Sequence, residues 1–240
     1  MNSKTGIWFY IKNYKFNSIF IKNFLLIVIL IFLPLAGLNV AVYNYFNDIT
    51  KDEASASAQD AISRVRDVVD LIALEIDRLS VRIASNIEVI SLLETSIGRF
   101  PDYETIQRFQ NVWNQISVTT ITSDYIDSIY IYSEKNNYVL STTKGSSEFE
   151  YFYDVSWKNE YDEKKYEFKR WTTYRRVAQQ FNKDIYYNFI TTFCLIPIYD
   201  SKILGVAVIN VNADKLGKLI NNFNNDPFKS VYIIDENNSI

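Results

Sequence analysis

An unbroken apolar segment near the N-terminus, residues 24–42, constrains this chain most. It holds nineteen residues without an ionisable side chain, and fourteen of them are Leu, Ile, Val or Phe. These fourteen contribute about −4 to −8 kcal/mol to membrane insertion, which Pro34, Gly37 and Asn39 do not cancel. As a helix the segment is about 28 Å long, close to the hydrocarbon thickness of a bilayer. The segment therefore predicts a transmembrane helix, which interfacial aromatic residues extend to 24–46.

Charge differs on the two sides of this segment and predicts its orientation. Residues 1–23 contain four lysines and no acidic residue, whereas acidic residues follow from Asp48 onward. Because positive flanks stay on the cytoplasmic side, we expect a cytoplasmic N-terminal tail over 1–23 and an extracellular bulk, anchored in the lipid bilayer of the cell membrane. A cleaved signal peptide is the alternative, but this leader is long for one and no A-x-A site follows the apolar run.

Composition excludes several classes of function. The chain has no histidine, which removes the usual general base and the commonest zinc ligand. Its one cysteine, Cys194, lies in an apolar strand-like run and is expected to be a buried, inert thiol. Beyond the apolar segment, 21 basic residues face 28 acidic ones, and this acidic balance disfavours nucleic-acid binding. We therefore expect no catalytic residue, metal site, cofactor or nucleic-acid partner in this sequence.

Apolar residues between Asp52 and Thr95 recur in steps of four and three, which is the spacing of a coiled-coil seam. This spacing predicts a long helix that forms a stalk over 47–97. The seam can pack on the chain's own domain or pair with a second copy in a homodimer, and we favour a combination of the two. The repeat drifts at Asn86, where the seam is expected to change partner. The candidate dimer seam consists of Ile62, Val65, Val69, Ile72 and Ile76.

Beyond Ser123 the apolar pattern changes from a helical period to alternation, which indicates strands. A helix that starts near Pro101 precedes these strands, and a short helix capped by Asn212 or Asp214 follows them. The fold class expected is α+β, with a transmembrane helix, a long extracellular helix and an antiparallel sheet flanked by helices. The strands predicted are 126–132 with 138–143 in a first hairpin, and 187–199 with 203–211 in a second.

This order of elements resembles the distal lobe of a double Cache domain, a PAS-like extracellular sensor of bacterial receptors. IDSIYIYSEKNNYVLSTTKG looks like the first Cache hairpin, YFYDVSWKNEYDE like the helix after it, and ITTFCLIPIYDSKILGVAVINVNADKL like the closing hairpin with its terminal helix. The sequence of these segments is most similar to that of membrane-bound sensor histidine kinases of Gram-positive bacteria, the YesM-like class. The resemblance implies a sensor lobe over 98–225, with an aromatic-rich helical insert between its hairpins. It also implies the start of a truncated proximal lobe over 226–240, so the chain is expected to be a fragment.

Cache domains that sense amines and amino acids use aromatic side chains and an arginine from the segment between the two hairpins. The resemblance therefore implies a pocket for a small-molecule ligand, since aromatic faces hold cations and a guanidinium grips a carboxylate. RWTTYR departs from the family's amino-acid motif, which leaves the ligand open. Alternatively, the tryptophans are core residues and the arginines lie on a solvated face. The candidate ligand-binding residues are Tyr153, Trp157, Arg170, Trp171, Tyr174, Arg175 and Tyr187.

Three functions remain open at this point. In the first, the chain is the sensing region of a two-component sensor histidine kinase, which acts on a cytoplasmic response regulator through an output domain that this sequence does not contain. In the second, the same sensing region serves a membrane-bound AraC-type transcriptional regulator or a chemoreceptor. In the third, the chain is a single-span coiled-coil scaffold. The aromatic segment 151–187 distinguishes the third, because a scaffold needs no pocket.

Overall fold

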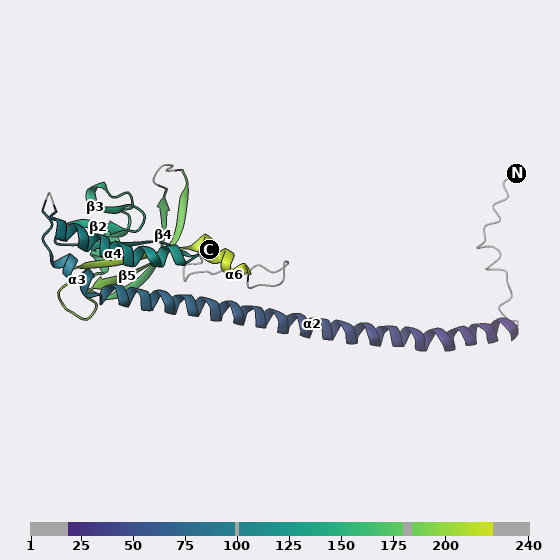
Figure 1. Cartoon of the computed structure of the whole chain (residues 1–240). Helices are drawn as coiled ribbons and strands as arrows, with labels where there is room; N and C mark the ends of the chain where they lie inside the picture. The colour runs from purple at the N-terminus through teal and green to yellow at the C-terminus, as the bar shows by residue number, and fades with distance from the viewer. Residues whose placement is uncertain (1–18, 99–100, 180–183, 223–240) are drawn as a thin grey trace, which may run out of the picture. The chain divides into compact units, whose positions relative to one another are not determined.

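The computed structural model describes residues 19–98, 101–179 and 184–222 (Figure 1). The candidate start of a proximal lobe at 226–240 and most of the N-terminal tail lie outside the described residues. The elements are α2 (Ile19–Ala84), α3 (Ile87–Glu94), α4 (Tyr103–Thr122), β1 (Ile126–Ser133), β2 (Tyr138–Ser141), β3 (Gly145–Glu148), the 3-10 helix η1 (Phe149–Tyr151), α5 (Trp157–Lys164), β4 (Arg170–Ala178), β5 (Tyr186–Ile196), β6 (Gly205–Asn212) and α6 (Ala213–Asn222).

The chain divides into two compact units, Met1–Asp60 and Ala61–Ile240. The described part of the first unit is the N-terminal part of α2. Among the described residues, α2 is the one helix long and apolar enough to cross a membrane, and the apolar side chains of its stretch 24–46 are mostly exposed. The polar side chain within this stretch is satisfied locally, because Asn39 donates to the carbonyl of Leu35 at 3.0 Å.

The second unit is built on a six-stranded antiparallel sheet in the order β3-β2-β1-β6-β5-β4. Both predicted hairpins are present, as β1 with β2 and β5 with β6. Strand β6 pairs with β1 as well as with β5, which places β6 in the interior of the sheet and buries all eight of its residues. The α+β fold expected from the sequence is therefore confirmed.

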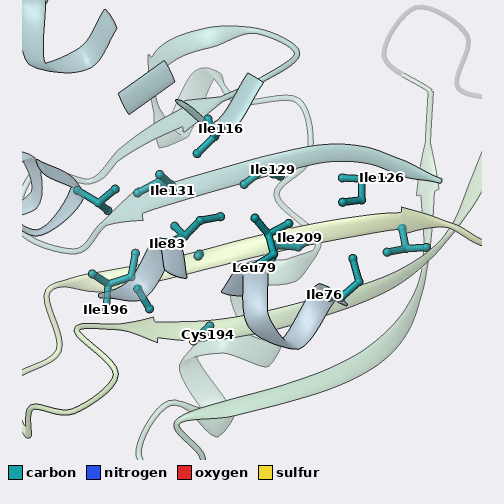
Figure 2. Close-up of a cluster of buried hydrophobic side chains, with 14 of the residues drawn as sticks. Ile76, Leu79, Ile83, Ile116, Ile126, Ile129, Ile131, Cys194, Ile196 and Ile209 are labelled. Carbon is teal, nitrogen blue, oxygen red and sulfur yellow. The ribbon is translucent and has the colours of Figure 1, made fainter. Parts of the chain in front are cut away.

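One face of the sheet is covered by helices and carries an aliphatic core (Figure 2). In that core, Ile76, Leu79 and Ile83 of α2 lie with Ile209 of β6 and Cys194 of β5. Because Cys194 is fully buried, desolvation raises the pKa of its thiol to about 11, so it stays protonated and inert at neutral pH. The C-terminal part of α2 thus packs on the chain's own sheet.

The opposite face is covered by the segment 149–164, which contains η1 and α5. Its core is aromatic and consists of Tyr130, Tyr132, Val139, Phe152, Trp157, Tyr161, Phe193, Leu195, Val206 and Val208. The hydroxyl of Tyr161 donates to Glu134 at 2.9 Å, which ties α5 to the end of β1. This face carries most of the candidate ligand-binding residues.

Two local features differ from the sequence-based expectation. The predicted drift of the seam at Asn86 is a helix boundary, because the Asn86 side chain accepts a hydrogen bond from the backbone N–H of Glu88 and caps α3. In its described part, the expected helical insert contains the short helices η1 and α5, and it continues as strand β4. Strand β4 is rich in β-branched and aromatic residues, such as Thr172, Tyr174 and Val177, which favour a pleated surface over a helix.

Candidate ligand-binding face of the sheet

A row of polar side chains crosses the centre of the aromatic face. The strand register places Ser128 of β1, Asn210 of β6 and Thr191 of β5 side by side, and all three are fully buried. The Asn210 amide donates to the hydroxyl of Ser128 at 3.0 Å and accepts from the hydroxyl of Thr191 at 2.9 Å. Buried sheet positions are more often apolar, and these three polar side chains are tolerated here because they hydrogen-bond to one another.

A buried ion pair joins this row to the covering segment. Arg175 of β4 and Asp154, which lies between η1 and α5, form two parallel hydrogen bonds of 3.1 Å each, and their side chains are 6% and 0% exposed. Ser156 donates to the Asp154 carboxylate at 2.8 Å and accepts from Arg175 at 2.8 Å. On the sheet side, Arg175 donates to Thr191 at 3.0 Å and to Asn210 at 2.9 Å. All five N–H donors of Arg175 are therefore satisfied.

Two tyrosines extend the polar network from the sheet to the covering segment. The hydroxyls of Tyr130 on β1 and Tyr153 lie 2.8 Å apart, and Ser128 donates to the Tyr130 hydroxyl at 3.3 Å. Burial raises the pKa of both phenols above their ordinary value. Both groups therefore stay neutral at physiological pH and act as hydrogen-bonding groups.

Two tryptophans of this face have buried indole N–H groups without a hydrogen-bond partner among the described residues. Trp157 is fully buried and meets the rings of Tyr132 and Phe149 edge-on, with centroids 5.4 and 5.5 Å away. Trp171 stacks on Phe193 at 4.8 Å. Because an unsatisfied buried donor costs about 1–3 kcal/mol, these two N–H groups are the candidate hydrogen-bond donors of this face.

The seven candidate residues do not all lie on this face. Because side chains alternate along a strand, Trp171 and Arg175 point to one side of β4, and Arg170 and Tyr174 to the other. On that other side Arg170 pairs with Asp77 of α2 at 2.6 Å. The residues on the aromatic face are Tyr153, Trp157, Trp171, Arg175 and Tyr187, which stacks on Phe189.

The polar partners on this face were not among the sequence candidates. Asp154, Ser128 and Thr191 carry no motif of their own, and their partners are distant in sequence. Asn210 had a usable signal, because it interrupts the apolar run ILGVAVINV, where a polar side chain at a buried position calls for a partner.

A separate surface cleft of about 570 Å³ lies at the β3 edge of the sheet. Its lining includes Asn136, Tyr138, Glu148 and Tyr151, and none of the seven candidates. The aromatic face and this cleft are therefore distinct places.

Comparison with solved structures finds chains of similar fold, whereas comparison with sequences does not. No family model matches the chain, and no curated protein matches it either. Among solved structures, the chain is similar to the ligand-binding domain of the Campylobacter jejuni chemoreceptor Tlp3, which was crystallised in complex with L-norvaline, with a TM-score of 0.50 and 18% sequence identity. The match covers 75% of this chain and 64% of that chain.

At this level of identity the similarity establishes the fold alone. A long helix and an antiparallel sheet are arranged as in that chemoreceptor ligand-binding domain. This agrees with the α+β fold class expected from the sequence, and the match spans 64% of the length of the other chain.

Proposed function

We propose that the sheet unit is an extracellular sensing domain for a small molecule and serves a membrane-anchored signalling receptor. The observation that carries this proposal is the pair of buried indole donors, Trp157 and Trp171, which have no acceptor in the part of the chain that the structure describes and lie on the same face as a buried polar network. A scaffold has no use for such a surface, because an all-apolar face would pack better. The fold similarity to a ligand-binding domain supports the same conclusion.

The contacts of β4 supply a physical route from this face to α2. Along one strand, Trp171 and Arg175 belong to the aromatic face, while Arg170 on the opposite side pairs with Asp77 of α2. A ligand that shifts β4 would therefore shift the helix that continues into the apolar segment. Such coupling requires only that the ligand bind two arrangements with different affinity.

The receptor class that we propose first is a sensor histidine kinase of the YesM-like type, anchored by 24–46 with its N-terminus in the cytoplasm. It would act on a response regulator through an output domain beyond this sequence. A chemoreceptor is the second candidate, which the similarity to the Tlp3 ligand-binding domain favours.

A thermal-shift screen of the full chain in detergent micelles tests the sensing function. With amino acids, amines, carboxylates and sugars as separate panels, we expect at least one compound to raise the melting temperature by about 3 °C or more. Trp171→Phe keeps an aromatic ring against Phe193 but removes the indole N–H. We expect this variant to lower the affinity for the same compound about tenfold, which is the loss of one well-formed hydrogen bond.

Trp113→Phe is the matched control, because the indole of Trp113 donates to the carbonyl of Ser141 from α4, outside the aromatic face. It should leave ligand affinity unchanged. The sensing proposal fails if no panel compound stabilises the chain, or if Trp171→Phe and Trp113→Phe bind the compound equally well.

The homodimer remains a proposal, and the exposure of the seam residues shows which substitution can test it. Val65, Ile72 and Ile76 of the candidate seam are buried in the chain's own core, whereas Ile62 is 63% exposed. We therefore expect Ile62→Glu to abolish chemical crosslinking between copies without changing the melting temperature. Leu71→Glu, at a position 66% exposed outside the seam, is the control that should crosslink normally. Unchanged crosslinking of Ile62→Glu would refute pairing through this seam.

A further inference from the structure

The Arg175 guanidinium is closed off from solvent, because Asp154 of the covering segment 149–164 binds it and both side chains are buried. Any ligand that reaches this guanidinium must therefore lift or shift the segment. We propose that the Asp154 carboxylate occupies the position on the Arg175 guanidinium that an external carboxylate would take. This ion pair acts as a latch, which holds the segment 149–164 on the sheet until an external carboxylate displaces Asp154. This inference rests on the proposed sensing function and adds to it the ligand class and the resting state of the site.

The division of the Arg175 hydrogen bonds supports a separable latch. Two of its five N–H donors bind the sheet, at Thr191 and Asn210, and hold the guanidinium in place. The other three reach the covering segment, two at Asp154 and one at Ser156. If the segment moves away, Arg175 stays anchored on the sheet with three donors directed outward, and that fork matches the two oxygens of a carboxylate.

Ser156 adds a second link between the covering segment and Arg175. Its backbone is already helical, with φ −65° and ψ −24°, and its side chain makes no capping bond to α5. Its hydroxyl donates to Asp154 and accepts from Arg175, so the serine belongs to the latch contact rather than to the helix cap.

The surroundings favour an anion over a cation as the incoming group. With Asp154 withdrawn and the segment lifted, the sheet would present the guanidinium of Arg175 together with the indole N–H of Trp171, which has no hydrogen-bond partner among the described residues. These are donors, and a planar carboxylate reproduces the geometry of the group that it displaces. The tethered Asp154 has the high effective concentration of an intramolecular partner, so only a carboxylate with further contacts on this face can compete in the wild-type chain.

Replacing Asp154 by alanine in the full chain, in detergent micelles, tests the latch with acetate as the probe. We expect acetate at tens of millimolar to raise the melting temperature of Asp154→Ala by about 3 °C or more, and to leave the wild type unchanged. Acetamide, the neutral analogue, and sodium chloride at equal ionic strength should have no such effect. The double variant Asp154→Ala/Arg175→Met should not respond to acetate. If acetate stabilises Asp154→Ala no more than acetamide or chloride, or no more than the double variant, the latch is refuted.

Asp154→Asn keeps the shape of the side chain and provides a second test if the alanine variant does not fold. We expect backbone amides of the covering segment, such as those of Phe152 and Lys158, to exchange hydrogen about tenfold faster in Asp154→Asn, with β6 unchanged. Asp162→Asn, on the exposed side of α5, is the control. Equal exchange in the two variants, or faster exchange throughout the sheet, would overturn the latch. If the ligand of the wild-type chain has no carboxylate, the latch is refuted but the sensing function stands. If the screen finds no ligand at all, the sensing function itself is refuted.

Discussion

Arg175→Met is expected to lower the free energy of unfolding by about 3–5 kcal/mol, because it leaves the carboxylate of Asp154 buried without a counter-charge. The Asp154 side chain is fully buried, so water cannot replace the lost hydrogen bonds. Ser156 alone continues to donate to this carboxylate. Denaturant unfolding of the full chain in detergent, followed by tryptophan fluorescence, measures the effect.

The double variant Asp154→Asn/Arg175→Met separates the cost of an uncompensated charge from the cost of lost packing. We expect it to be more stable than Arg175→Met alone, because it removes the orphaned charge. Arg170→Met is the control, since its ion pair with Asp77 is 36% and 40% exposed and should contribute about 1 kcal/mol or less. Equal losses for Arg175→Met and Arg170→Met would show that the buried pair does not hold the covering segment.

Local rules of the chain predicted the elements that flank the candidate site. The alternation around the EKNN turn and the run ILGVAVINV identified the strands of both hairpins, because burial on a sheet face imposes a period of two. Local signals also indicated two helix starts. Pro101 indicated the start of α4, where Asp102 is the N-cap and accepts from the N–H of Thr105. Of the two predicted caps of α6, Asn212 is the one that accepts a backbone N–H, from Lys215.

The side of the sheet on which each candidate lies could not be predicted. Arg170 and Arg175 are the same residue type in one short stretch, but they are an odd number of positions apart and so point to opposite faces of β4. Their assignment requires knowing that this stretch is a strand. It also requires the register, which pairs Arg170 with Cys194 and Arg175 with Phe189. Neither is encoded in the spacing RWTTYR.

The polar network was equally beyond sequence reasoning, because its bonds join residues that are distant in the chain. Asp154 and Arg175 are 21 positions apart, and Asn210 and Ser128 are 82 apart. The heptad seam shows the same limit in a helix. Its spacing identifies the apolar face of α2, but the same pattern serves a coiled coil and a helix on a sheet, and only tertiary structure shows Ile72 and Ile76 packed in the chain's own core.

Gly205→Ala is expected to destabilise the sheet by more than the about 1–3 kcal/mol typical of an overpacked core, because the obstacle is backbone. A Cβ at this position would lie 1.8 Å from the carbonyl oxygen of Tyr132 and 3.0 Å from its carbonyl carbon. Gly205 pairs with both neighbouring strands, so relief of the clash must separate β6 from β1 or distort the closing hairpin.

Gly217→Ala in α6 is the matched control, because nothing lies within 4 Å of its Cβ and alanine favours a helix by about 1 kcal/mol. Denaturant unfolding should give the highest free energy of unfolding for Gly217→Ala, a lower one for the wild type and the lowest for Gly205→Ala. A Gly205→Ala chain as stable as wild type would show that β1 and β6 do not approach each other as closely at this point as the register requires.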